Sequence, residues 1–404
     1  MNPGAGVSAS AFMPSTDGRR VRIGIAGLGA AGQAFIPAIR RHEGFDWVAL
    51  ADPVQVVRER TQREHGVATY ASLPELLSHP GLDAVYLATP TPLHADHVLQ
   101  VAAAGKHVLV EKPMAITLEQ GRAMVDAAQH AGVILLVGHS HSYDTPIKRM
   151  RELIASGELG RVRMVNTWCF TDWLYRPRRP DELDAEQGGG VTFRQGSHQF
   201  DVIRLLCGGQ ASSVRAKTFD WNPRRPAIGA HIVFLEFDNG AAATAVYNGY
   251  GGFASMDLCS DISEWGFHQP VHQRQRTTVP STGLSQEEEL RAKQARARNA
   301  IPAGAPYQPF FGLTLVSCEL GDIRQSPTGL LVYTEAGRRQ IELPVDRTPR
   351  ELVLAEFHDA ITGRAPALHD GRWGLANLEV CVAAILSSST GREVRLEEQV
   401  AVPA

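Results

Sequence analysis

Short apolar runs alternate with longer polar-faced stretches along the first third of the chain. The apolar runs predict buried strands at Val21–Ala26, Trp47–Ala51, Ala84–Ala88, His107–Val110 and Val133–Val137. The stretches between them predict helices such as Gln33–Arg41, Val54–His65 and Thr117–Ala131. Strands that alternate with helices in this way are typical of a doubly wound parallel sheet.

The pattern changes near Gly138. After a predicted helix, longer strand-like runs follow at Val162–Phe170, Ser213–Phe219, Ala230–Phe237, Ala241–Asn248, Leu313–Leu320, Gly329–Thr334 and Arg339–Leu343. Asp238-Asn239-Gly240 between two of these runs is a hairpin signal. The helices of this part are predicted at Pro146–Ala155, Arg350–Ile361 and Gly371–Ser388. We therefore predict an α/β protein, with a parallel domain at 19–138 and a C-terminal α+β domain at 139–404 built on an open, mostly antiparallel sheet.

Two segments fall outside these patterns. Residues 1–18 are rich in Gly, Ala, Ser and Pro and lack the charged start and apolar core of a signal peptide, so we expect a disordered tail. Residues 262–308 are polar and resemble an insertion, with a helix at Gln286–Asn299 that Ser285 and Glu288 would cap. A lid, an oligomer contact and a mobile loop are all compatible with this segment.

Composition excludes several classes of protein. A chain of 404 residues with 44% hydrophobic and 21% charged residues suits two globular domains. The net charge of −3 and the lack of a membrane-length apolar run give no reason to expect a nucleic-acid or membrane partner. The five cysteines are far apart and form no CxxC, so we expect neither disulfides nor a zinc knuckle, and a cytoplasmic location fits best.

A glycine-rich turn follows the first predicted strand. Gly27-Leu28-Gly29-Ala30-Ala31-Gly32 has the spacing GxGxxG, and the second predicted strand ends in Asp52, twenty residues after Gly32. In this spacing the first glycine permits a tight turn, the second lets the backbone approach a pyrophosphate, and the third lets the helix pack close to the strand. The helix start adds free N–H groups for the phosphates. The order of strand, turn, helix and acid predicts a dinucleotide in a Rossmann domain.

The acid also bears on which dinucleotide binds. Asp52 can accept the hydroxyls of the adenosine ribose, and its charge would repel the 2′-phosphate of NADP. Pro53 follows where an NADP enzyme often has Ser or Arg, although Arg58 and Arg60 lie nearby. We therefore expect NAD rather than NADP.

A lysine follows the fourth predicted strand, in Glu111-Lys112-Pro113. Ligands of open parallel sheets bind beyond the carboxyl ends of the strands, which would place Lys112 beside the nicotinamide. There a lysine can hydrogen-bond a substrate hydroxyl and stabilise an alkoxide. The loop from Thr89 to His94 favours this interpretation over a solvated lysine at a strand end.

From about residue 20 to 390 the chain resembles the glucose–fructose oxidoreductase / inositol dehydrogenase / MocA (GFO/IDH/MocA) family. The motifs that carry the resemblance are the glycine turn, Ala88-Thr89-Pro90 with His94, Glu111-Lys112-Pro113, and Gly196-Ser197-His198-Gln199-Phe200-Asp201 after Gly188-Gly189-Gly190. The resemblance implies NAD(P)-dependent oxidation of a secondary alcohol, or the reverse, with Lys112 and His198 as catalytic residues. It also implies a homo-oligomer, a dimer or tetramer, that often assembles through the C-terminal sheet. The cofactor contacts that it implies are Gly27, Gly29, Ala30, Ala31, Gly32, Asp52, Thr89, Pro90, His94, Glu111 and Lys112.

The surroundings of His198 depart from the family pattern. His198 stands at a predicted helix start, where an imidazole could take the alcohol proton; a buried histidine bonded to Asp201 is the alternative. Many family members carry an acid four residues before this histidine, whereas this chain has Arg194. An arginine cannot act as a base, but it suits an anionic substrate.

Further candidate substrate contacts lie in two loops. One loop carries Trp173, Tyr175, Arg176, Arg178 and Arg179, whose rings could hold a planar substrate and whose guanidinium groups match carboxylates. Arg178 and Arg179 could instead pair with the acids that follow them in a solvated loop. The other loop carries His139 and His141, which could bind substrate hydroxyls. No carboxylate spacing supports a metal site with His198, so we expect no metal.

A small anionic substrate, an aromatic or alicyclic dicarboxylate diol, would fit these residues together. Within the family, Gly138–Tyr143 and Phe193–His198 resemble the branch that oxidises phthalate 4,5-cis-dihydrodiol to 4,5-dihydroxyphthalate in aromatic degradation. The alternatives are an inositol or sugar-acid dehydrogenase, an NAD-using glycosidase of the same fold and a non-catalytic NAD-binding sensor.

Overall fold

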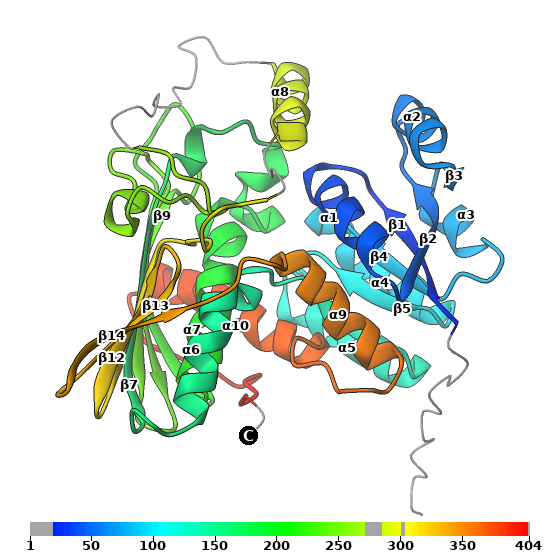
Figure 1. The fold of residues 1–404 in the computed structure, drawn as a ribbon. Coiled ribbons are helices and arrows are strands. Elements are labelled where there is room, and N and C mark those ends of the chain that lie inside the picture. The colour runs from blue at the N-terminus through cyan, green and yellow to red at the C-terminus, as the bar shows by residue number, and fades with distance from the viewer. Residues whose placement is uncertain (1–18, 271–284, 300–303, 403–404) are drawn as a thin grey trace, which may run out of the picture.

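The computed structural model describes residues 19–270, 285–299 and 304–402. The predicted disordered tail at 1–18 lies outside the described residues. Figure 1 shows two sheets side by side, with helices between and around them. No helix in these ranges is long and apolar enough to span a membrane.

The N-terminal half contains a six-stranded sheet in the order β3-β2-β1-β4-β5-β6, and every neighbouring pair is parallel. Its strands are β1 (Val21–Ala26), β2 (Phe45–Ala51), β3 (Ala68–Tyr70), β4 (Ala84–Leu87), β5 (His107–Val110) and β6 (Leu135–Val137). Its helices are α1 (Ala30–Arg41), α2 (Gln55–His65), α3 (Leu73–Leu77), α4 (His94–Ala103) and α5 (Leu118–Ala131). The predicted doubly wound sheet is thus confirmed. Strand β3 escaped prediction because it has three half-buried residues and no apolar run.

The C-terminal half contains a nine-stranded sheet in the order β14-β13-β12-β11-β7-β10-β9-β8-β15. Its strands are β7 (Val162–Phe170), β8 (Ala211–Phe219), β9 (Ala230–Phe237), β10 (Ala242–Asn248), β11 (Leu313–Cys318), β12 (Gly321–Ser326), β13 (Gly329–Thr334), β14 (Gly337–Glu342) and β15 (Val394–Arg395). Among the described strands of this sheet only β7 and β10 pair in parallel, which confirms a mostly antiparallel sheet. The predicted run at Leu313–Leu320 ends at Cys318 and turns into β12, which the prediction missed because Asp322 and Arg324 interrupt its apolar residues.

The remaining helices are α6 (Thr145–Ala155), α7 (Ser197–Cys207), α8 (Gln286–Asn299), α9 (Pro349–Ile361) and α10 (Gly371–Thr390). In Figure 1, α6, α7 and α10 lie on one face of the nine-stranded sheet. The capping box predicted for α8 is present, since the amides of Ser285 and Glu288 each donate to the other residue's side chain.

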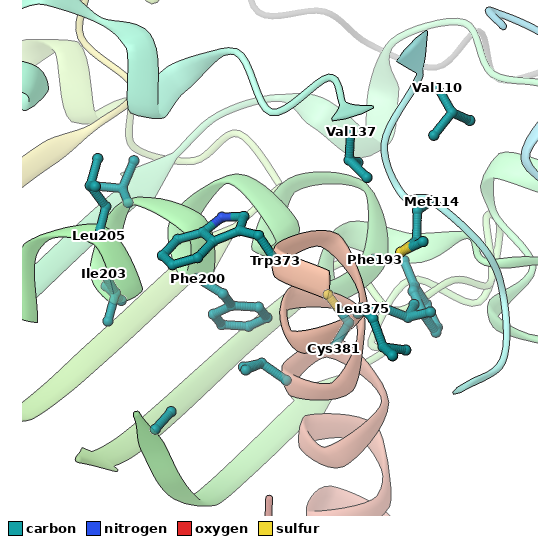
Figure 2. Packing of buried hydrophobic residues seen from close by; sticks show 14 of the residues in the cluster. Val110, Met114, Val137, Phe193, Phe200, Ile203, Leu205, Trp373, Leu375 and Cys381 are labelled. Atoms are coloured by element: carbon teal, nitrogen blue, oxygen red, sulfur yellow. The ribbon is translucent and has the colours of Figure 1, made fainter. Parts of the chain in front are cut away.

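The closing helices pack back onto the N-terminal half. Helix α9 buries Val353, Leu354 and Phe357 in one cluster with the apolar residues of β1 and α1. Helix α10 packs against both α5 and β8, and Figure 2 shows Trp373 and Leu375 of α10 near Val137 of β6 and Phe200 of α7. Fully burying a large apolar side chain contributes about 1.5–3 kcal/mol, so these contacts fix the two halves firmly together. The loops after β4, β5 and β6 therefore face the loops of the second sheet. The proposed domain division at residue 138 stays a prediction.

Candidate active site

Two of the glycines in the turn after β1 are required by close backbone contacts. A Cβ on Gly27, whose φ is +89°, would stand 2.8 Å from the Ala88 carbonyl oxygen. A Cβ on Gly32 would stand 2.2 Å from the Gly27 carbonyl oxygen. A Cβ on Gly29, by contrast, would meet no atom of the described residues within 4 Å, so space is open beside its backbone. Such open space beside the backbone is what a pyrophosphate needs.

A pocket of about 270 Å³ opens at this turn. It is lined on one side by Gly29, Ala30 and Ala31 at the start of α1, and no side chain in the described part of the chain caps that helix end. The first N–H groups of the helix are therefore available to an anion. The loop after β4 and Lys112 after β5 line the same pocket. The free helix end suits the phosphates of a dinucleotide, and Lys112 lines the same pocket.

The glycine turn offers a matched pair of variants. Gly29→Ala should fold normally and weaken NADH binding by about tenfold, because the added methyl group fills the space that the pyrophosphate approaches. Gly32→Ala should lower the melting temperature as well, because its Cβ overlaps a carbonyl oxygen. NADH fluorescence titration and thermal melts measure both effects. Unchanged NADH affinity in Gly29→Ala would place the phosphates elsewhere.

Asp52 organises the turn from the end of β2. Its Oδ2 accepts the backbone N–H of Leu28 and its Oδ1 accepts that of Val54, each at 2.9 Å. The side chain is buried, and each oxygen retains a second lone pair for a ribose hydroxyl. Arg58 donates to the carbonyls of Asp52 and Pro53, so its guanidinium is already bound to the backbone.

His94 connects two loops at the carboxyl edge of the sheet. Its ring nitrogens lie 2.8 Å from the Thr89 carbonyl oxygen and 3.0 Å from that of Pro113, and the residue is buried. Burial lowers the pKa of His94 to about 4. His94 therefore positions the loop that contains Thr89 and Pro90, although it also borders the pocket.

Lys112 points across the pocket to the second half of the chain. Its Nζ donates to the Arg194 carbonyl oxygen at 2.7 Å, in a π-helical turn at Thr192–Gly196 that leads into α7. Burial, followed by the charge of Arg194, lowers the pKa of Lys112 to about 7. A lysine with such a pKa can hold or release a proton near neutral pH. The adjacent Glu111 accepts the hydroxyl of Tyr86 at 2.6 Å.

His198 stands in the first turn of α7 and is buried. Its ring meets that of His141 edge to face, with centroids 4.6 Å apart, and lies 5.2 Å from that of Phe311. Burial and the charges of Lys112 and His141 hold the pKa of His198 well below its usual value, so the ring is neutral. Among the described side chains no hydrogen bond joins it to Asp201, whose Oδ1 accepts the indole N–H of Trp373 at 2.7 Å. Among the described residues, Nδ1 of His198 has no hydrogen-bond partner.

His141 is held between two carboxylates. Its Nδ1 lies 3.0 Å from Asp144 and its Nε2 lies 3.4 Å from Glu264. Burial lowers its pKa, but the two carboxylates outweigh burial and raise the pKa to about 9. Both N–H groups of this imidazolium are thus occupied, so His141 shapes the site beside His198 rather than donating to a substrate. Glu264 belongs to the segment 262–308, and no local sequence pattern there indicates this contact.

His139 is buried near Asp201, and neither ring nitrogen has a hydrogen-bond partner in the described part of the chain. Burial lowers its pKa to about 4. Within residues 19–270, 285–299 and 304–402, no three His, Cys, Asp or Glu side chains are grouped as metal ligands.

Most of the candidate arginines already have carboxylate partners. Arg176 pairs with Asp172 at 2.8 Å, Arg179 with Asp181 at 2.8 Å, and Arg194 with Glu182 at 3.3 Å. The exception is Arg178, which has no carboxylate within 4.0 Å among the described side chains.

Arg178 is the guanidinium that is free to bind an added carboxylate. It stacks on the ring of Trp173 at 4.1 Å, donates to the Trp173 carbonyl oxygen and lines the pocket. Trp173 is fully buried, so its ring supports Arg178 instead of facing the cleft, and Tyr175 is half-buried beside it. Sequence reasoning could not separate these arginines, because their partners are set by the fold.

Comparison with known proteins agrees with this geometry. Residues 21–139 match the NAD-binding Rossmann fold of the GFO/IDH/MocA oxidoreductase family, and residues 147–253 match its C-terminal domain. A 1-carboxy-3-chloro-3,4-dihydroxycyclohexa-1,5-diene dehydrogenase from Comamonas testosteroni is 36% identical over 371 residues, which is 90% of this chain and 94% of that protein.

Solved structures show the same fold. A protein of Bordetella bronchiseptica RB50 that is described as a dehydrogenase matches with a TM-score of 0.87 at 39% identity, over 93% of this chain and 100% of that one. The WlbA dehydrogenase from Bordetella pertussis, solved with NADH and UDP-GlcNAcA, matches in fold with a TM-score of 0.69 at 24% identity, over 95% of this chain and 99% of that one. The chain is therefore an NAD-binding oxidoreductase that acts on a CH–OH group, and it belongs to the GFO/IDH/MocA family.

Proposed function

We propose that the protein oxidises a carboxylated cis-dihydrodiol of a six-membered ring, with phthalate 4,5-cis-dihydrodiol as the substrate that its sequence favours. The observation that carries the proposal is the position of Arg178, which is free of a carboxylate partner among the described residues and shares a pocket with Lys112. The Comamonas testosteroni relative is named for a substrate with a ring carboxylate and two hydroxyls, which supports this class.

In the proposed reaction, Arg178 binds the substrate and Lys112 and His198 handle the proton. NAD, when bound, accepts the hydride from the carbinol carbon. Arg178 binds the ring carboxylate and thereby aims that C–H bond at the cofactor. Lys112 hydrogen-bonds the substrate hydroxyl and takes its proton. The neutral His198 is a second group that can accept a hydrogen bond from that hydroxyl. The ketone then tautomerises to a catechol, and the gain of aromaticity favours oxidation.

The experiment that tests the function is NADH formation at 340 nm with a panel of substrates. The panel contains phthalate 4,5-cis-dihydrodiol, a monocarboxylated cis-dihydrodiol, inositols and sugar acids. We expect turnover on the carboxylated diols only. Turnover confined to inositols or sugar acids would reject the substrate class, and NADH binding without turnover on any of them would favour a sensor.

Arg178 provides a direct test of carboxylate binding. Arg178→Gln should raise KM for carboxylated diols by about 10–100-fold with a smaller effect on kcat, because a charge-assisted hydrogen bond is worth about 1.5–3 kcal/mol. The matched control is Arg179→Gln, since Arg179 is already paired with Asp181. Equal KM values for both variants would remove Arg178 from substrate recognition.

We also propose that copies of the chain associate through the outer face of the nine-stranded sheet. Two strands of that face, β7 and β9, lie on either side of β10. They present four apolar side chains that are 41–51% exposed: Met164, Trp168, Ile232 and Phe234. Trp168 aligns with Val246 of β10, which aligns in turn with Ile232 of β9, so these side chains form one apolar surface.

Trp168→Asp should therefore convert an oligomer to a monomer, as measured by light scattering after gel filtration. The control is Val56→Asp on α2, which is 68% exposed on the other half of the molecule. An unchanged mass for the Trp168 variant would place the interface elsewhere.

A further inference from the structure

Helix α8 lies over the dinucleotide pocket. Leu290 and Lys293 of this helix line the pocket together with Gly29, Ala30 and Ala31 of the glycine turn. Helix α8 also packs against α1, the helix that begins at that turn, and Figure 1 shows it between the two halves of the molecule. A segment that the sequence marks only as a polar insertion thus forms a wall of the cofactor site.

Ion pairs attach α8 to the second half of the chain. Lys293 pairs with Glu182, whose side chain is only 2% exposed, and Glu289 pairs with Arg225 at 2.6 Å. Glu182 pairs with a second cation, Arg194, at 3.3 Å. It also accepts the backbone N–H of Arg179 at 2.8 Å. Burial lowers the pKa of Lys293 to about 8, although Glu182 opposes the shift, so Lys293 is largely protonated at pH 7.

The pocket has more positive than negative side chains around it. Its cations are Lys112, Arg178, Arg179, Arg194 and Lys293, and its acids are Glu111 and Glu182. A pyrophosphate that rests on the start of α1 would meet Lys293 from the opposite side, since α8 packs on α1. A lysine can move from a buried carboxylate to a nearby phosphate because its three donors swivel on a flexible stem.

We propose that α8 is part of the dinucleotide site, with Lys293 binding the cofactor pyrophosphate opposite Gly29 and Leu290 covering it from solvent. On binding, Lys293 shares its charge between Glu182 and the pyrophosphate, while Glu182 keeps Arg194 as a partner. The inference rests on NAD binding by the family and is independent of the proposed substrate.

The test measures binding in the absence of any substrate. Lys293→Met should raise the Kd for NADH, titrated by fluorescence, by about tenfold, and should lower the salt dependence of that Kd. Lys293→Arg keeps the charge and should bind within about threefold of wild type. Arg291→Met is the matched control, because Arg291 is 71% exposed on the same helix and pairs with Glu287. Thermal melts of each variant report whether it is folded.

Competing ligands locate the contact along the cofactor. Displacement of NADH by ADP-ribose, which keeps the pyrophosphate, should weaken in Lys293→Met by the same factor as NADH itself. Displacement by adenosine, which lacks phosphates, should be unchanged. Wild-type affinity of folded Lys293→Met for NADH would overturn the proposal. A loss for NADH but not for ADP-ribose, or a change confined to substrate KM, would equally overturn it.

Discussion

Replacement of Lys112 by methionine will lower kcat for NAD-dependent oxidation by about 10²–10⁴-fold, the usual contribution of a positioned acid or base. The Nζ of Lys112 donates across the pocket to the Arg194 carbonyl oxygen, and methionine keeps a long unbranched side chain without the amine. The Kd for NADH should change by no more than a few-fold, because the phosphates are expected at the glycine turn and not at Lys112.

The control for this variant is Lys148→Met, an exposed lysine of α6. Stopped-flow kinetics and NADH titration separate the effect on chemistry from the effect on cofactor binding. An equal loss of turnover and NADH affinity in the Lys112 variant would assign Lys112 to cofactor binding alone.

The pH dependence follows from the same residue. A base must be unprotonated to accept the hydroxyl proton, so kcat/KM should rise as the pH passes the pKa of Lys112, which is about 7. The groups that set this value are Arg194, Glu111, Glu264 and Arg178, together with burial, which is the largest cause. In Lys112→Met this rise with pH should be absent.

Local sequence patterns predicted the elements whose structure depends on residues close together in the chain. The glycine turn, its acid and most strands of the two sheets follow from residue spacing and from the alternation of apolar and polar positions, whereas β3 and β12 do not. The position of Lys112 followed from a general property of parallel sheets, in which ligands meet the carboxyl ends of the strands. Lys112 and Arg194 line one pocket, and both lie close enough to His198 for their charges to lower its pKa.

Long-range contacts could not be predicted in this way. Glu264, Glu182 and Lys293 are ordinary charged residues in polar segments, and nothing near them in sequence distinguishes them from solvated residues. Their roles arise because the fold places Glu264 on His141 and Lys293 on Glu182. The burial of Trp173 beneath Arg178 is another such case, since an aromatic residue in an arginine-rich loop looks exposed until the second sheet covers it.

His198→Asn should lower kcat by about 10²-fold, a smaller loss than that of Lys112→Met, and should keep the rise of kcat/KM near pH 7. The loss is expected because His198, whose ring packs against those of His141 and Phe311, is the second acceptor in the proposed reaction. The rise is kept because the buried His198 is already neutral at this pH, so its removal takes away no titrating charge.

The comparison of the two catalytic variants decides which residue is the principal base. His130→Asn, an exposed histidine of α5, is the control for general effects of replacing an imidazole. If His198→Asn abolishes the rise with pH while Lys112→Met retains it, the two residues exchange roles and Lys112 becomes the group that only orients the hydroxyl. If both variants keep the rise of kcat/KM with pH, neither residue is the titrating base. The rise must then come from another group of the protein or from the substrate. If Lys112→Met loses the rise of kcat/KM with pH and His198→Asn keeps it, Lys112 is the base that titrates near neutral pH and His198 is neutral there.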